Sequence, residues 1–123
     1  MLVVDDIKDV ADTCSMLIEL AGHEVRAAYT GARALEIGEV LRPEVILSDI
    51  SLPDIDGYEL AQRVRATDWG HDAVLVAITG WGEEDRKGRS LEAGFSHHLT
   101  KPIDPETIES LLESLAAVQS SML

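Results

Sequence analysis

Cysteine, aromatic residues and basic residues are all scarce in this sequence of 123 residues. Cys14 is the single cysteine, so no disulfide can form within the chain, and we expect a reducing, cytoplasmic setting. Ten lysines and arginines stand against 23 aspartates and glutamates, which gives a formal net charge of −13. Binding to nucleic acid depends on clustered cationic side chains that displace counterions. The composition therefore excludes a nucleic-acid-binding function and disfavours an anionic membrane surface.

Long apolar stretches are missing as well. The run from Val74 to Ile78 is far shorter than the roughly 20 apolar residues that a membrane-spanning helix needs. The first residues also lack the basic segment and apolar segment of a signal peptide. We therefore expect no membrane insertion. The length and the 46% apolar content predict one domain, residues 1–123, with one hydrophobic core.

Short apolar runs rich in β-branched residues alternate with stretches that have apolar residues at helical spacing. The predicted strands are residues 2–4, 24–28, 44–47, 73–78 and 95–99. Apolar stripes mark the first helix, where Val10, Cys14 and Ile18 are expected to face the core, and the last helix. The fourth helix, residues 83–93, is mostly charged and should pack least firmly. This alternation predicts an α/β fold with a doubly wound, five-stranded parallel sheet.

Polar residues stand where the predicted strands end. The pairs and triplets at these ends are Asp5-Asp6, Ser48-Asp49, Thr79-Gly80 and Thr100-Lys101-Pro102. Because the carboxyl ends of parallel strands share one edge of the sheet, we expect these groups to converge there. Two carboxylates about 4 Å apart repel by about 4 kcal/mol at an effective dielectric near 20, so the site needs cations. Lys101 supplies one positive charge, and Mg²⁺, which prefers oxygen ligands, is the predicted cofactor.

Such a site suits phosphoryl transfer. A carboxylate can act as the nucleophile and become an aspartyl phosphate, while a lysine and Mg²⁺ offset the charge on the phosphoryl oxygens. Asp49 follows the predicted central strand and is therefore the expected nucleophile. We expect Thr79 and Lys101 to contact the phosphoryl oxygens.

Four segments resemble the receiver domain of two-component response regulators, in that family's order. They are residues 3–6, 49–57, 78–80 and 94–102. The resemblance, which extends over nearly the whole chain, implies the strand order 2-1-3-4-5. It also implies that Asp49 is the phosphoacceptor. The implied Mg²⁺ ligands are Asp6, Asp49 and the carbonyl of Ser51, with Asp5 acting through water.

The same resemblance implies a signalling domain rather than a metabolic enzyme, one that only phosphorylates and slowly dephosphorylates itself. The expected phosphoryl donor is a histidine kinase or a histidine phosphotransfer domain. Thr79 and His98 are the implied switch residues, and His98 occupies a position that usually holds Tyr or Phe in the family. The switch would alter a surface made by the fourth helix, the fifth strand and the fifth helix, where a homodimer could form. The sequence leaves open whether the domain is a stand-alone regulator or part of a hybrid sensor histidine kinase.

Other interpretations fit parts of this pattern. Asp5 and Asp6 could simply cap the first helix. Phosphohydrolases that form an aspartyl phosphate have a similar site, but they need a second acid two residues after the nucleophile, where this chain has Ser51. An interaction module that works without phosphorylation would require a broken acidic site, whereas all the expected residues are present.

Overall fold

The computed structural model describes residues 1–80, 93–101 and 103–121, without the side chains of residues 116–121. Within these ranges one parallel sheet contains β1 (Leu2–Val4), β2 (Arg26–Ala28), β3 (Val45–Asp49), β4 (Val74–Thr79) and β5 (His97–Thr100). The strand order is β2-β1-β3-β4-β5, which confirms the predicted fold class. The predicted fourth helix lies outside the described residues except for Ala93.

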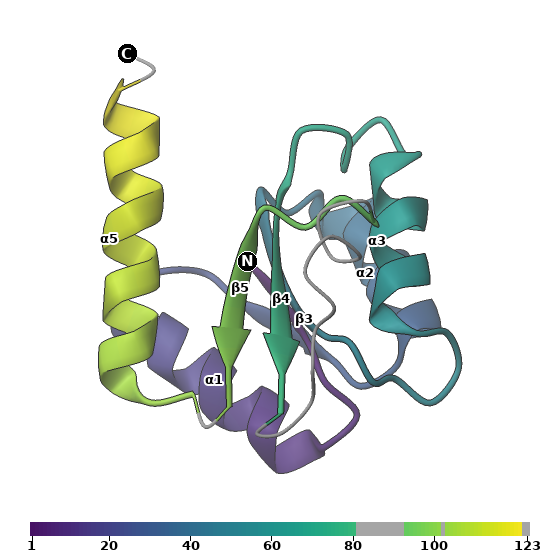
Figure 1. Cartoon of the computed structure of the whole chain (residues 1–123), viewed down its shortest axis with the longest axis horizontal. Coiled ribbons are helices and arrows are strands. Elements are labelled where there is room, and N and C mark those ends of the chain that lie inside the picture. Colours follow the sequence, from purple (N-terminus) through teal and green to yellow (C-terminus); the bar gives the residue numbers. More distant parts are fainter. Residues whose placement is uncertain (81–92, 102, 122–123) are drawn as a thin grey trace.

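Helices cover both faces of the sheet (Figure 1). One face is covered by α1 (Lys8–Leu20) and α5 (Pro105–Ser121), and the other by α2 (Gly31–Leu41) and α3 (Gly57–Arg65). Alternate strand residues supply the two cores, because successive side chains of a strand point to opposite faces. In β1, for example, Leu2 and Val4 belong to the core under α2 and α3, while Val3 belongs to the core under α1 and α5.

The helix stripes agree only partly with the sequence pattern. In α1 the buried residues are Ala11, Cys14 and Ile18, whereas Val10 is only partly buried. Cys14 is 2% exposed, and burial raises the pKa of its thiol to about 11. The cysteine is thus a small core residue, as expected. No helix in the described part of the chain combines the length and the apolar character needed to cross a membrane.

Three strands run further than predicted. β3, β4 and β5 end at Asp49, Thr79 and Thr100, one or two residues beyond the end of each apolar run. A backbone ladder continues as long as N–H and C=O groups find partners, whatever the polarity of the side chains. Asp49 and Thr79 are therefore the last residues of their strands, and the ladder holds their backbones in place.

Strand register sets which of these ends are neighbours. β3 lies at the centre of the sheet, between β1 and β4. Val4 of β1 pairs with Ser48 of β3, and Asp49 pairs with Ile78 of β4. The residues that follow these pairs consequently meet at one edge of the sheet.

Candidate functional site

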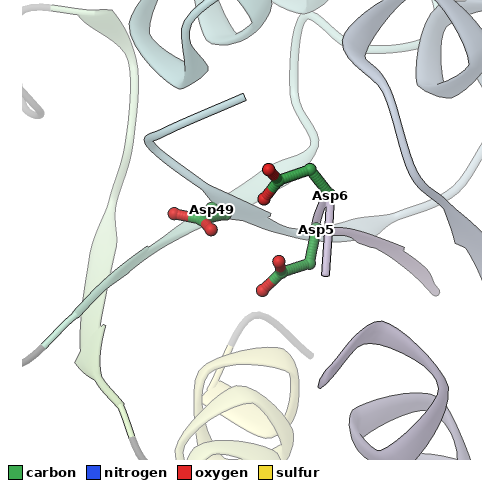
Figure 2. A group of neighbouring side chains, drawn as sticks. All are labelled: Asp5, Asp6 and Asp49. Atoms are coloured by element: carbon green, nitrogen blue, oxygen red, sulfur yellow. The ribbon is translucent and has the colours of Figure 1, made fainter. Parts of the chain in front are cut away.

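Three carboxylates gather at this edge, where β1 and β3 end side by side (Figure 2). Asp5, Asp6 and Asp49 each offer an oxygen, and these atoms lie within 4.8 Å of one another. Asp5 and Asp49 are buried, while Asp6 is exposed. The pairing of Val4 with Ser48 accounts for this proximity, because it places the residues that follow them next to each other.

Lys101 reaches the same cluster from the segment after β5. Its Nζ lies 3.0 Å from Oδ2 of Asp5 and 3.0 Å from Oδ2 of Asp49. Its backbone N–H donates to the carbonyl of Thr79 at 2.7 Å, which fixes the start of the side chain. Burial disfavours the ammonium form, but the interactions of Lys101 with Asp49 and Asp5 outweigh burial and raise the pKa of Lys101. The side chain therefore stays charged at neutral pH.

Asp5 is held as a buried carboxylate and does not cap a helix. Its Oδ1 accepts a hydrogen bond from the N–H of Ile7 at 2.9 Å. Burial is the main cause that raises the pKa of Asp5, although the Ile7 N–H and Lys101 oppose it. The N-cap of α1 is Ile7, which makes no side-chain capping bond. The capping interpretation of Asp5 and Asp6 is therefore wrong for α1.

The cluster has the donor set of a hard divalent cation. Three carboxylates and one ammonium leave a net charge of −2 within a few ångströms. Oδ2 of Asp5 is buried and lacks a hydrogen bond of normal geometry, although the Lys101 ammonium lies beside it. Such an oxygen gains most from a metal ion, because a buried charge without a full set of partners is costly. Oxygen-only ligands and a partly open site fit Mg²⁺.

Both oxygens of Asp49 have partners that orient the carboxylate. Oδ1 accepts a hydrogen bond from the backbone N–H of Ser51 at 3.1 Å, and Oδ2 accepts one from Lys101 at 3.0 Å. Gly57 packs closely over the same backbone, because a Cβ there would lie 2.6 Å from the Asp49 carbonyl oxygen. The Ser51 side chain is exposed, so it is the backbone of this residue that approaches the site.

Thr79 and His98 are in direct contact. The Thr79 side chain is buried at the end of β4, and its Oγ1 lies 2.9 Å from Nε2 of His98 on β5. The same hydroxyl donates to the carbonyl of Leu99 at 3.5 Å. His98 itself is exposed. A hydrogen bond thus joins a buried residue beside the acidic cluster to an exposed side chain on the neighbouring strand.

A cavity of about 490 Å³ opens beside the cluster. Its lining residues are Asp9, Val10, Thr13, Cys14, Gly80, Lys101 and Ile103. Lys101 therefore lies beside an apolar wall between α1 and the segment before α5. No sequence pattern marks this cavity, because its wall combines residues from separate elements.

The comparisons with known proteins agree on one family. Residues 1–113 match the sequence profile of the response regulator receiver domain. The phosphate regulon transcriptional regulatory protein PhoB of Pseudomonas aeruginosa is 31% identical over 115 residues, and the transcriptional regulator RpaA of Synechocystis is 30% identical over 115 residues. Both alignments include 94% of this chain, which spans only 50% and 48% of those proteins. This chain thus corresponds to about half the length of such relatives.

Solved structures support the same assignment. The chemotaxis response regulator CheY4 of Vibrio cholerae superposes with a TM-score of 0.85 at 29% identity, over 92% of this chain and 94% of that one. A CheY-like response regulator receiver domain protein from Methanospirillum hungatei gives a TM-score of 0.87 at 26% identity, over 99% and 96% of the two chains. Together with the sheet order and the profile match, these likenesses show that the chain belongs to the receiver domain family of two-component response regulators.

Proposed function

We propose that this chain is a phosphoacceptor signalling domain, which takes a phosphoryl group from a phosphohistidine onto Asp49 with the help of Mg²⁺. The observation that carries the proposal is the position of Lys101. Its ammonium lies 3.0 Å from both Asp5 and Asp49, at the edge of a cluster of three carboxylates. A phosphoryl group that joins Asp49 would enter a region where positive charge is already fixed.

The proposed reaction is a transfer between two side chains. An oxygen of Asp49 attacks the phosphorus atom and forms the new O–P bond, while the P–N bond of the donor histidine breaks. The electron pair of that bond stays on the imidazole nitrogen, which takes up a proton. Before transfer, the Ser51 N–H and Lys101 hold the carboxylate in a fixed orientation.

Two kinds of charge would stabilise the transferred group. Mg²⁺ held by Asp5, Asp6, Asp49 and the carbonyl of Ser51 offsets the charge on the phosphoryl oxygens when it is bound. Lys101 can pair with one phosphoryl oxygen, because its ammonium already lies beside Asp49. Its raised pKa keeps that charge in place over the physiological pH range.

The signal would leave the site through Thr79 and His98. A phosphoryl oxygen on Asp49 offers the Thr79 hydroxyl a charged acceptor in place of its present partner on β5. Turning toward the phosphoryl group would break the 2.9 Å contact between Thr79 Oγ1 and His98 Nε2, and so release the exposed ring. Phosphorylation then shifts a conformational equilibrium, because the new charge stabilises one arrangement more than the other.

The proposed donor is a histidine kinase or a histidine phosphotransfer domain in the cytoplasm. Ile7, which is 53% exposed beside the acidic cluster, offers apolar contact area to a protein donor. The apolar wall of the cavity next to Lys101 offers further apolar contact area to such a donor. A second copy of the chain could dock where His98 is released, on β5 and α5, which makes a homodimer part of the proposal.

The direct test is phosphorylation with a small donor that carries the same P–N bond, such as phosphoramidate. With Mg²⁺ present, the intact mass of the wild-type chain should rise by about 80 Da, the mass of HPO₃. The chain should gain no mass when Mg²⁺ is chelated, and Asp49→Asn should gain none in either condition. An equal gain in Asp49→Asn would show that Asp49 is not the acceptor.

A further inference from the structure

We infer that Asp54 is a positioning residue, which holds the loop after β3 so that Ser51 orients the Asp49 carboxylate for cation binding. The inference rests on the proposed function in one respect, because it takes the cluster of Asp5, Asp6 and Asp49 as a magnesium site. It adds a residue that lies outside the cluster and a mechanical link between the cluster and α2.

Asp54 belongs to the loop between β3 and α3, yet its carboxylate binds a different helix. Oδ1 accepts a hydrogen bond from the N–H of Gly31 at 2.9 Å, and Oδ2 accepts one from the N–H of Ala32 at 2.8 Å. These are the first two residues of α2, whose N-cap residue Thr30 accepts instead from the N–H of Arg33. Hydrogen bonds from Ala32 and Gly31 lower the pKa of Asp54, so the carboxylate is ionised at the positive end of the helix.

An apolar contact reinforces this attachment. Gly31 is buried, and a Cβ at that position would lie 2.4 Å from Cγ1 of Ile55, the residue after Asp54. Ile55 and Leu52 both pack against the core cluster that α2 and α3 cover. The tip of the loop is therefore docked on α2 by two carboxylate hydrogen bonds and by close packing.

Docking of the loop tip on α2 also restricts Ser51, because the loop between Asp54 and the acidic cluster is short. Only Leu52 and Pro53 separate Asp54 from Ser51, and the proline ring fixes one backbone dihedral of that link. At the other end of the loop, the N–H of Gly57 donates to the carbonyl of Ile50 at 2.7 Å. A loop that is closed at its base and docked at its tip leaves Ser51 little freedom. The 3.1 Å hydrogen bond from Ser51 to Asp49 then holds Oδ1 in place.

Removing the attachment should weaken metal binding by a limited factor. A loop that samples several conformations binds its ligand with an affinity reduced by the fraction of molecules in the competent conformation. A carboxylate that caps a helix supplies enough free energy to change such an equilibrium about fivefold. We therefore expect Asp54→Ala to raise the dissociation constant for Mg²⁺ about fivefold, without removing any residue of the cluster.

The affinity for Mg²⁺ can be measured by calorimetry on the full chain, with two controls. Asp104→Ala removes a carboxylate that accepts from the N–H of Thr107 at 2.8 Å in α5, so it loses an equivalent helix contact elsewhere. Asp56→Asn removes one negative charge from the same loop but keeps the oxygen that accepts from the N–H of Glu59. Both controls should bind Mg²⁺ as the wild type does.

A second variant tests the apolar half of the attachment. Gly31→Ala leaves Asp54 intact but forces Ile55 away from α2, so it should also weaken Mg²⁺ binding. Linkage requires the reverse effect in the wild type, because a ligand favoured by the docked loop must in turn favour docking. Amide hydrogen exchange at Gly31 and Ala32 should therefore slow when Mg²⁺ is added. A carboxylate that merely stabilised α2 would slow exchange at Gly31 and Ala32 no more than Mg²⁺ slows it at Thr107, whose N–H donates to Asp104 in the same way.

The possible outcomes separate this inference from the proposed function. Wild-type affinity in Asp54→Ala would overturn the positioning role and leave the magnesium site intact. An equal loss of affinity in Asp104→Ala would also overturn it, because the effect would then follow from general stability. A wild-type chain that binds no Mg²⁺ at millimolar concentration would instead overturn the magnesium site of the proposed function.

Discussion

A buried carboxylate such as Asp5 weakens a fold when it is ionised. Its side chain is 1% exposed, and burial raises its pKa above the ordinary value of 3.8. A group whose pKa is raised by folding stabilises the folded state below its ordinary pKa, and this contribution is lost as the pH rises through the raised value. Above this raised pKa the ionised Asp5 therefore lowers the free energy of unfolding.

Asp5→Asn should consequently be more stable than the wild type at neutral pH when Mg²⁺ is absent. We expect a gain of about 1 kcal/mol, because Asn removes the desolvation cost of a buried charge while Lys101 keeps Asp49 as its partner. The gain should shrink as the pH falls through the raised pKa of Asp5, where the wild-type carboxyl takes up its proton. Urea denaturation at several pH values measures both effects. A less stable variant at neutral pH would mean that pairing with Lys101 outweighs burial.

Among the elements, the end of α3 is connected to the segment before β5 by the side chain of Arg65. Its Nη2 donates to the carbonyl of Gly94 at 2.7 Å, and its Nη1 donates to the carbonyls of Gly70, His71 and Ala73. Gly94 has φ +115°, and a Cβ there would lie 2.9 Å from Cγ of Arg65. The glycine thus leaves room for the arginine, which connects the end of α3 to the loop before β4 and to the segment before β5.

Arg65→Ala should lower the free energy of unfolding by about 2 kcal/mol or more, because several carbonyls lose a charged donor. Arg63→Ala on the same helix is the matched control. Arg63 forms an ion pair with Glu59 at 3.5 Å, and both side chains are about half exposed. Its loss should cost less than about 1 kcal/mol. Equal midpoints of thermal unfolding for the two variants would contradict the structural role of Arg65.

For the molecule as a whole, the acidic cluster exists only when the sheet is complete. Asp5 and Asp6 follow β1, whereas Asp49 ends β3, and α1, β2 and α2 lie between them in the chain. We expect Mg²⁺ to stabilise the chain by about 2.7 kcal/mol at one hundred times its dissociation constant. Contacts between segments far apart in sequence form late in folding, so Mg²⁺ should mainly slow unfolding and hardly change the folding rate.

Stopped-flow experiments in urea, with and without Mg²⁺, measure how far Mg²⁺ changes the folding rate and how far it changes the unfolding rate. Asp49→Asn is the control, because it removes one carboxylate of the cluster and should abolish most of the effect. If Mg²⁺ accelerated folding as much as it slowed unfolding, the pairing of β1 with β3 would already be present in the transition state.

Much of this architecture is visible in the sequence because it depends on patterns. Apolar runs and helical stripes predict the strands and helices, and the polar residues at the strand ends identify the edge where Asp5, Asp49 and Lys101 meet. The strand order is implied by the family resemblance and not by these patterns. The ends of the strands were less predictable, because the ladder continues through polar residues such as Asp49 and Thr79.

Single contacts between distant segments could not be predicted. Asp54 and Arg65 each bind backbone groups of other elements, and neither the periodicity nor the spacing of the chain marks such partners. The same holds for Gly38, where a Cβ would lie 2.3 Å from the ring of Trp69. A glycine within a helix normally predicts a less stable helix. Here Gly38 makes space for the indole of Trp69, which lies in the loop after α3.

The register between β1 and β3 determines whether the chain has a cation site at all. A slip by one residue would reverse the face on which every side chain of β1 lies and would separate Asp5 from Asp49. A mispaired sheet could still be compact, but it would lack the three-carboxylate site. Cation binding therefore stabilises only molecules in which β1 and β3 are correctly aligned, and it selects them over mispaired ones.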